Sequence, residues 1–317
     1  MPKLGYTLSS EEFGPTELVD IARSAEDVGF DFVSISDHFH PWISAQGESP
    51  FVWSTLGGIA EATDEIEVGT GVTCPTTRIH PVNVAHAVAT VDEMLGDRFT
   101  FGVGTGENLN EHVTGERWPE HDVRLEKLEE AMNAMRKLWT GKTTSHHGEH
   151  YTIENAQLFT VPDEQPTTIA SAFGTQTAQW TADHADGLWC SGPREEPVEA
   201  YEEAGGDGPT FTQLHGCYAE TEDEAIDTVY EQWPNGSIPG ELGQELSTPA
   251  HFKQAAQMVD REDIAESGTT TDPDPQAHID SIENALDAGY DHVYFHQIGP
   301  DQDMALEFYA EEVLPSF

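Results

Sequence analysis

The fold class of this chain follows from one segment, which reads Phe32-Val33-Ser34-Ile35-Ser36-Asp37-His38-Phe39-His40-Pro41-Trp42. Its first four residues are mostly apolar with a β-branched and aromatic bias, which is typical of a buried strand. A carboxylate, an imidazole and an indole follow directly where that strand ends. Side chains of these kinds can bind a polar cofactor, move a proton and exclude water. We therefore expect a functional site at the carboxyl end of this strand.

A second polar segment follows the apolar residues at 99–101, and it reads Gly102-Val103-Gly104-Thr105-Gly106-Glu107-Asn108-Leu109-Asn110. A dinucleotide-binding motif is not indicated, because Glu107 stands where the third glycine would be. The small residues instead let a flat ring approach the backbone. Glu107 has few side chains nearby with which to pair, so we interpret it as reserved for a ligand rather than solvated. We expect the two segments to face each other in one site.

The rest of the chain alternates between strand patterns and amphipathic helix patterns. We expect strands at 4–8, 32–35, 66–70, 99–101, 167–170, 187–190, 211–214 and 292–296. We expect helices at 15–26, 50–60, 81–94, 123–139, 198–204, 275–288 and 304–313, and one more that follows the strand at 167–170 and ends at 182. About eight strands that alternate with helices favour an α/β fold of the closed (β/α)8 TIM barrel type over an open sheet.

This pattern predicts a single domain over residues 1–317 with two insertions, near 108–160 and 233–267. In such a barrel, the residues at the carboxyl ends of the strands face one common mouth. We therefore expect to find at that mouth Asp37, Cys74, Glu107, Cys190 and His296.

The chain is strongly acidic, with 59 Asp and Glu against 13 Lys and Arg and a formal net charge of -46. Such a surface repels nucleic acid and anionic lipid, which argues against both as partners. The acidic residues are spread along the whole chain, so a disordered acidic tail does not explain them. Because molar salt shortens the screening length to about 3 Å, we expect a protein from a salt-rich cytoplasm.

Three cysteines, Cys74, Cys190 and Cys217, lie far apart without a CxxC pair. Neither a disulfide framework nor a structural zinc site is therefore indicated. The sequence has no pattern of a signal peptide and no apolar run near the ~20 residues of a membrane helix, so we expect a cytoplasmic location.

His38 and His40 form a His-x-His pair after a strand, which is a metal-ligand pattern in some barrel hydrolases. The later strand ends do not offer the further ligands that such a site needs. A metal-dependent hydrolase remains an alternative, as does a purely structural histidine at 38. Trp42, Trp53 and Trp118 could likewise be packing residues, and we favour that interpretation for Trp53.

Several motifs, in one order along the chain, resemble the coenzyme F420-dependent glucose-6-phosphate dehydrogenases of the bacterial luciferase-like barrel superfamily. The resemblance is densest between Lys3 and Trp139. The motifs are Asp37-His38-Phe39-His40-Pro41-Trp42, Gly69-Thr70-Gly71-Val72, Pro75-Thr76, Gly102-Val103-Gly104-Thr105-Gly106-Glu107, Leu109-Asn110-Glu111 and Trp118-Pro119.

The resemblance implies a barrel enzyme that transfers a hydride from a sugar carbon to the deazaflavin of coenzyme F420, and a homodimer is expected. It assigns His38 as the base for the sugar hydroxyl, Glu107 as the acid for the reduced ring, Trp42 as the indole beside the reacting carbon and Glu11 as a substrate-side carboxylate. Cys74 and Cys190 stand where well-known members have Thr, so these two contacts are weaker here. The implied cofactor contacts are Asp37, Gly71, Val72, Cys74, Thr105, Gly106, Asn110 and Cys190, with a cis peptide bond expected at Gly71-Val72.

The implied roles agree with the physical chemistry of these groups. Hydride departure from a C–OH carbon needs the hydroxyl proton removed, which suits a neutral imidazole at His38, and we expect Asp37 to hold that ring. A protonated Glu107 could neutralise the charge that develops on the ring. The cofactor supplies the redox chemistry, while the protein aligns and desolvates.

The chain departs from these relatives where they bind a sugar phosphate with two lysines and an arginine. Pro193 stands at the first lysine position, with Arg194 beside it, and the other two positions fall in the segments 243–247 and 264–267, which lack cations. Only Arg194, Lys253 and Arg261 are near enough in sequence to compensate. Because a phosphate dianion needs several cationic donors, we expect an unphosphorylated sugar or simple alcohol to be preferred.

Two further alternatives remain. A monooxygenase that uses reduced FMN and oxygen would keep the same fold. A non-catalytic barrel is disfavoured by the clustering of Asp37, His38 and Glu107.

Overall fold

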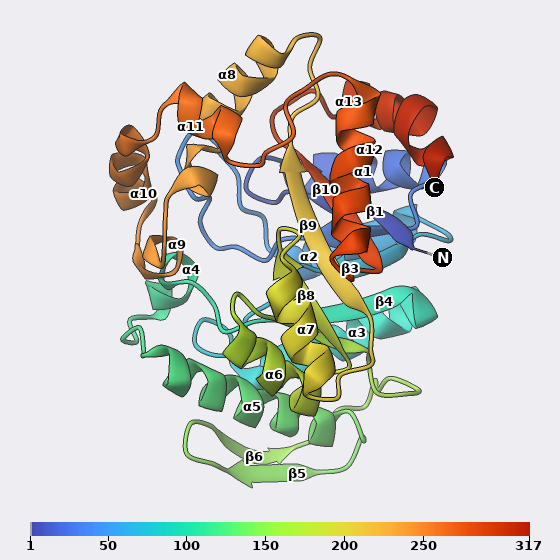
Figure 1. The fold of residues 1–317 in the computed structure, drawn as a ribbon. Coiled ribbons are helices and arrows are strands. Elements are labelled where there is room, and N and C mark those ends of the chain that lie inside the picture. The colour runs from blue at the N-terminus through green and yellow to red at the C-terminus, as the bar shows by residue number, and fades with distance from the viewer. Residues whose placement is uncertain (1) are drawn as a thin grey trace.

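Eight parallel strands close into a barrel in the computed structural model, which describes residues 2–317 (Figure 1). The hydrogen-bonded order around the barrel is β1, β10, β9, β8, β7, β4, β3 and β2. The predicted barrel fold is confirmed. The barrel strands are β1 (Lys3–Leu8), β2 (Phe32–Ile35), β3 (Glu67–Thr70), β4 (Phe99–Val103), β7 (Thr168–Ser171), β8 (Gly187–Ser191), β9 (Thr210–Gly216) and β10 (His292–Gln297).

Helices connect the strands and cover the outside of the barrel (Figure 1). Every helix predicted from apolar periodicity is present, although the last one continues from α13 as a π-helical turn at Tyr309–Val313. Helix α8 was not predicted, because acidic residues dominate its sequence and few apolar positions mark its buried face. The covering helices are α1 (Pro15–Val28), α2 (Val52–Ala62), α3 (Pro81–Leu95), α5 (His121–Leu138), α6 (Thr175–His184), α7 (Glu195–Glu203), α8 (Glu222–Gln232), α12 (Pro275–Asp287) and α13 (Gln302–Phe308).

The first and last strands close the barrel, since Lys3 of β1 lies opposite His292 of β10 and Tyr6 lies opposite Phe295. All neighbouring barrel strands are parallel, so their carboxyl ends lie at one end of the molecule. The segments that follow the strands are therefore brought together even when they are far apart in the sequence.

Alternation along each strand divides the apolar side chains into two layers. An inner cluster fills the barrel and consists of Phe32, Ile169, Trp189, Phe211 and Tyr294, with Val72 packed against it. A larger core lies between the strands and the helices, and Cys190, next to Trp189 in the sequence, belongs to this outer core.

The first predicted insertion is only partly an excursion from the barrel. Helix α5 packs against α3 in the helix layer, because its buried face joins the main core with Leu128, Met132, Met135 and Leu138. Only its first turns reach the mouth of the barrel, where His121 and Arg124 line a cavity. The extra structure is the short helix α4 (Asn108–Glu111) and an antiparallel hairpin of β5 (Thr144–His147) and β6 (Thr152–Ala156), which lies outside α5 (Figure 1).

The second predicted insertion contains the short helices α9 (Leu242–Glu245), α10 (Pro249–Ala255) and α11 (Arg261–Glu266). In Figure 1, α11 lies near α8, and α9 lies beside α4. It has a small apolar core of its own, in which Trp233, Phe252 and Ile264 pack with Ile43 and Leu109 from the segments after β2 and β4. The insertion is therefore attached to the mouth of the barrel. Among residues 2–317, no helix combines the length and the apolar character that crossing a membrane requires.

Candidate active site

A cavity of about 970 Å³ opens at the carboxyl ends of the barrel strands. Small-molecule sites typically have volumes of roughly 300–1,000 Å³, so this cavity can hold a large cofactor together with a small substrate. Residues from the ends of the barrel strands and from the second insertion line it. The lining includes these predicted site residues: Glu11, His38, Trp42, Gly71, Val72, Cys74, Thr105, Gly106, Glu107 and Arg194.

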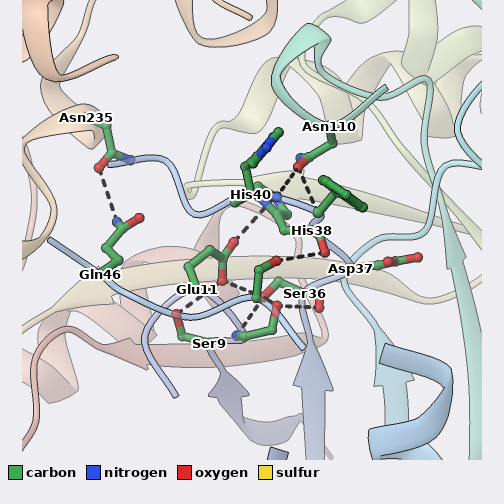
Figure 2. A network of polar contacts seen from close by, with 12 residues as sticks. Ser9, Glu11, Ser36, Asp37, His38, His40, Gln46, Asn110 and Asn235 are labelled. Carbon is green, nitrogen blue, oxygen red and sulfur yellow. Dashed lines mark hydrogen bonds and ion pairs between the residues drawn. The ribbon is translucent and has the colours of Figure 1, made fainter. Parts of the chain in front are cut away.

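The imidazole of His38 is held by Glu11 (Figure 2). Its Nε2 atom lies 3.3 Å from Glu11 Oε1, and the second carboxylate oxygen of Glu11 accepts hydrogen bonds from the hydroxyls of Ser36 (2.6 Å) and Ser9 (3.2 Å). The Nδ1 atom of His38 lies 3.2 Å from the carbonyl oxygen of His40, which can only accept, so Nδ1 carries the hydrogen. In the neutral ring Nε2 is then the nitrogen that can accept a proton, and it lies beside the Glu11 carboxylate.

Asp37 does not hold His38, and that prediction is wrong. Its carboxylate points away from the Glu11 cluster in Figure 2 and accepts hydrogen bonds from Arg78 Nη2 (2.8 Å) and the hydroxyl of Thr73 (2.8 Å). Asp37 is buried and lies outside the cavity lining. Its role in this structure is to anchor the segment after β2 to the segment after β3, since Arg78 also contacts its backbone oxygen at 3.2 Å.

A second buried carboxylate, Glu111, lies beside the same arginine, with its Oε2 atom accepting a hydrogen bond from the Arg78 backbone N–H at 2.7 Å. Burial raises the pKa of Glu111 to about 7, against the lowering effect of Arg78. Burial lowers the pKa of Arg78, but Asp37 and Glu111 raise it more, and the net shift is upward. The arginine therefore stays charged between the two acids.

Glu107 lies at the start of α4, half-buried in the cavity wall. Within residues 2–317 the structure records no hydrogen bond or ion pair to its carboxylate, in contrast to Glu11 and Asp37. Burial raises the pKa of the nearby Cys74 thiol well above its ordinary value, and Glu107 adds to this effect, so the thiol stays protonated. An acidic group without a protein partner in a ligand-sized cavity is suited to exchange a proton with a ligand.

The wall beside Glu107 is built of backbone that has no room for side chains. A Cβ atom at Gly104 would lie 2.7 Å from Ser171 Oγ and 2.8 Å from a methyl carbon of Val72, and one at Gly71 would lie 3.0 Å from the Tyr294 hydroxyl. Gly106 has φ +89°, which is a left-handed conformation that favours glycine. The peptide bond between Gly71 and Val72 is cis, as predicted.

Trp42 stands beside the imidazole of His38, with ring centroids 4.9 Å apart, and its other side meets Phe252 of α10 at 5.1 Å. All three side chains line the cavity. The indole therefore connects the predicted base to the second insertion.

Asn110 and Cys190, two predicted cofactor contacts, do not line the cavity. The Oδ1 atom of Asn110 accepts hydrogen bonds from the backbone N–H groups of Phe39 (2.9 Å) and His40 (3.1 Å), so this residue fixes the loop that carries His38, while its buried Nδ2 atom has no partner (Figure 2). Cys190 points into the outer core instead of toward the mouth, because Trp189 takes the inward position on β8. Burial raises the pKa of its thiol.

Two arginines line the cavity, Arg194 as predicted and Arg124, which sequence reasoning missed. Arg194 donates a hydrogen bond to the Phe173 carbonyl at 2.9 Å. Arg124 is buried, and its guanidinium stacks 4.3 Å from the Trp118 ring centroid and bonds to Gln244 Oε1 at 3.2 Å. Burial lowers the pKa of Arg124. The sequence did not predict Arg124 as a cavity residue, because its neighbours on α5 are ordinary core residues. The preceding Trp118-Pro119 motif was the one feature that could have indicated it.

The charged part of the cavity lining is mostly acidic. Five glutamates and two arginines line it, and Lys253 and Arg261 are not part of the lining; the glutamates are Glu11, Glu107, Glu120, Glu241 and Glu245. Arg261 instead pairs with Asp223 and Asp227 on α8. Neither of these two cations therefore compensates for the missing phosphate ligands.

The histidines of the alternative metal motif are each bonded to the backbone, since Nδ1 of His38 lies 3.2 Å from the His40 carbonyl and Nδ1 of His40 lies 3.0 Å from the Leu109 carbonyl. Across the part of the chain that the structure describes, no group of three or more His, Cys, Asp or Glu side chains is arranged to hold a metal ion.

The chain is similar to curated enzymes along its full length. It is 31% identical over 326 residues to the F420-dependent glucose-6-phosphate dehydrogenase of Microbacterium testaceum, covering 99% of this chain and 96% of that protein. It is 32% identical over 327 residues to the enzyme of the same name from Nakamurella multipartita, again with 99% and 96% coverage.

Solved structures give the same result. An F420-dependent secondary alcohol dehydrogenase in complex with an F420-acetone adduct superimposes with a TM-score of 0.90 at 28% identity, covering 98% of both chains. The coenzyme F420-dependent tetrahydromethanopterin reductase of Methanopyrus kandleri shares the fold, with a TM-score of 0.79 at 21% identity and coverage of 100% and 99%. The model of the luciferase-like monooxygenase family matches residues 1–292. The chain therefore belongs to the luciferase-like monooxygenase family, within which its relatives are the F420-dependent glucose-6-phosphate dehydrogenases.

Proposed function

We propose that this chain is a coenzyme F420-dependent oxidoreductase that takes a hydride from an alcohol or sugar carbon. The observation that carries the proposal is the pairing in one cavity of a carboxylate-held imidazole, His38, with a carboxylate that has no protein partner, Glu107. Relatives named F420-dependent glucose-6-phosphate dehydrogenase and a neighbour named F420-dependent secondary alcohol dehydrogenase support it.

The residues present fit a flat deazaflavin. Gly71 and Gly104 leave a cradle that a Cβ atom would fill. The cavity also includes Gly174, Gln176 and Thr177 at the start of α6. We assign the ring to the backbone at Gly71-Val72 and Gly104–Gly106, and the anionic tail of the cofactor to the N-terminal turn of α6, where unpaired N–H groups favour negative charge.

When bound, the cofactor supplies the hydride acceptor. His38 takes the proton of the substrate hydroxyl at Nε2, and Glu11, 3.3 Å away, stabilises the imidazolium that results. Glu107, in its protonated form, donates a proton toward the negative charge that develops in the cavity. Trp42 orients the substrate beside His38 and excludes water.

We further propose that the substrate is not phosphorylated. The cavity presents Arg124 and Arg194, but Arg124 already bonds to Gln244 and lies 3.7 Å from Glu245. A phosphate dianion in this acidic lining would lack the several cationic donors that it needs.

The test is kcat/KM with F420 for glucose, propan-2-ol and glucose 6-phosphate in molar salt. We expect glucose or propan-2-ol to exceed glucose 6-phosphate by about tenfold or more, which corresponds to ~1.4 kcal/mol. A clear preference for glucose 6-phosphate would contradict the proposal. Measuring quenching of F420 and FMN fluorescence with the same protein tests the alternative of an FMN-dependent monooxygenase, for which we expect no binding of FMN at comparable concentration.

We also propose that the chain forms one domain and works as a homodimer in a salt-rich cytoplasm. The dispersed net charge of -46 supports the salt adaptation. Exposed aromatic side chains such as Phe39, Phe51 and Phe159 supply apolar surface that a second copy could cover. Sedimentation velocity in molar potassium chloride tests the dimer, and a monomer at all concentrations would contradict it.

A further inference from the structure

A second carboxylate–histidine arrangement, of which the two histidines line the same cavity, has no role in the chemistry described above. Glu12, the neighbour of Glu11, is buried, and its Oε2 atom lies 2.8 Å from Nε2 of His296. Its other oxygen accepts the backbone N–H of Gly299 at 2.9 Å. Nδ1 of His296 lies 3.1 Å from Nδ1 of His215, so the three side chains form a linear relay.

The barrel itself holds this relay in place. His215 and His296 occupy paired positions on the neighbouring strands β9 and β10, so their side chains leave the sheet on the same side. The indole of Trp233 packs on His296 edge to face, with ring centroids 4.5 Å apart. His215, His296 and Trp233 all line the cavity, whereas Glu12 lies behind them.

The relay leaves one atom free. Both ring nitrogens of His296 are engaged, and only Nδ1 of His215 is, so Nε2 of His215 has no recorded partner among residues 2–317. Burial lowers the pKa of His215 to about 3, with His296 adding to the effect, so this ring is neutral. Its Nε2 atom either accepts or donates, depending on where the relay places its hydrogens, and a hydroxyl can complement both.

We propose that His215 is a second substrate-binding residue, which hydrogen-bonds a hydroxyl group other than the one that is oxidised, and that Glu12 and His296 are the positioning residues that fix its ring. The cavity then selects polyhydroxylated substrates, such as vicinal diols and sugars, over alcohols with one hydroxyl. This inference rests on the proposed function. Its physical basis is that a substrate without the second hydroxyl leaves a polar atom of the site unpaired.

The sharpest test compares propane-1,2-diol with propan-2-ol, because the two share the carbon that is oxidised and differ by one hydroxyl. With F420 in excess, we expect wild-type kcat/KM to favour the diol by about tenfold or more. In His215→Phe this ratio should fall to within about twofold of unity, and His215→Gln, which keeps a hydrogen-bonding group, should retain part of it. The dissociation constant of F420 should change less than twofold in both variants.

The positioning role has its own measurement. In Glu12→Gln we expect KM for the diol to rise about fivefold with kcat within twofold, because the ring of His215 loses its orientation while the oxidised carbon stays beside His38. His86→Phe, on the exposed face of α3, is the matched control for His215→Phe. It should change neither the ratio of kcat/KM for the diol to that for propan-2-ol nor KM for the diol.

The outcomes are distinguishable. If wild type reduces F420 with these alcohols but His215→Phe keeps the diol preference, the inference is wrong and the proposed function stands. The inference is also overturned if the His215 variants bind F420 more weakly but keep the wild-type preference for the diol. If wild type reduces F420 with no alcohol, the proposed function fails and the inference falls with it. Should His215→Phe not fold, His215→Gln and Glu12→Gln decide instead. The proposal is contradicted if His215→Gln keeps the full diol preference and the wild-type F420 affinity, and Glu12→Gln keeps the wild-type KM for the diol.

Discussion

At the cavity wall, the carboxylates differ in whether the protein already satisfies them. Glu11 has Ser9, Ser36 and His38 as partners, and its geometry is therefore fixed. Glu107 has none recorded among residues 2–317 and is free to meet a ligand. A fixed carboxylate suits electrostatic stabilisation of an imidazolium, and a free one suits proton exchange.

This division of roles predicts the behaviour of two variants. His38→Ala and Glu107→Gln should each lower kcat by on the order of 10²-fold or more, because both residues act on protons. The dissociation constant of F420 should stay within a few-fold of wild type, since neither residue belongs to the segments Gly71-Val72 and Gly104–Gly106 to which we assign the ring. Stopped-flow reduction of F420 and a fluorescence titration measure the two quantities.

Glu283→Gln, on the exposed face of α12, controls for a general effect of removing one negative charge. Near-normal turnover in both His38→Ala and Glu107→Gln would refute the assignment of the base and the acid.

Most of the site residues predicted from the sequence line the cavity, because they follow strands and barrel geometry brings strand ends together. Sequence reasoning failed where a partner is distant in the chain. Asp37 was expected to hold its neighbour His38, but Arg78, 41 residues away, binds it. A cation that pairs with an acid outcompetes a neutral imidazole for a buried carboxylate. The relay through Glu12 and His296 spans 284 residues and leaves no local pattern.

Among the elements, the second insertion matters most for the cavity, because α10 reaches back to the segment after β2. Phe252 is almost fully buried between Trp42 and the small core of the insertion. Gln46 donates to the carbonyl of Gln232 at the end of α8 (3.0 Å) and to Asn235 Oδ1 of the insertion (3.3 Å); Figure 2 shows the contact with Asn235. The position of the Trp42 indole in the cavity thus depends on an element outside the barrel.

Truncating this contact should affect substrate more than cofactor. In Phe252→Ala we expect KM for the alcohol to rise about tenfold, since Trp42 loses the ring that holds it, while F420 affinity changes little. Removing a buried phenylalanine costs about 3–5 kcal/mol, so the unfolding midpoint should also fall. Phe252→Leu keeps most of the volume and should lose less in both measurements. Equal loss of F420 and alcohol affinity would show that α10 supports the whole cavity instead.

The elements themselves were largely predictable, because apolar periodicity is a local property. The barrel strands were all found, since each is a short apolar run bounded by turns. The β5–β6 hairpin was missed because its strands are polar and exposed on much of their surface, as in Thr144–His147. Helix α5 was taken as part of an insertion because the chain before it is irregular, whereas its packing on α3 depends on tertiary structure.

On the scale of the whole molecule, 59 acidic and 13 basic residues leave most carboxylates without a cation. Their mutual repulsion opposes the compact state in dilute buffer and is screened by salt. Between 0.1 M and about 3 M potassium chloride we expect the unfolding midpoint to rise by roughly 10 °C, which corresponds to a few kcal/mol. Differential scanning calorimetry at pH 7 measures this.

The same scan near pH 4.2, the isoelectric point of the sequence, separates screening from general salting-out. There the salt response should be much smaller, because the net charge is close to zero and repulsion between carboxylates is offset by attraction to the cationic side chains. An equal rise at both pH values, or none at pH 7, would contradict the salt adaptation.

The contact between Glu12 and His296 also has a consequence for biosynthesis. The two residues are separated by 284 positions, and ribosomes add about 5–20 residues per second, so Glu12 is made roughly 15–60 s before its partner. During that interval β1 lacks its neighbour β10, and the loop that carries both Glu11 and Glu12 lacks one wall. The nascent chain therefore exposes an unpaired edge of β1 and an incomplete ligand site until almost all of it has been translated, and an unpaired strand edge favours aggregation during that time.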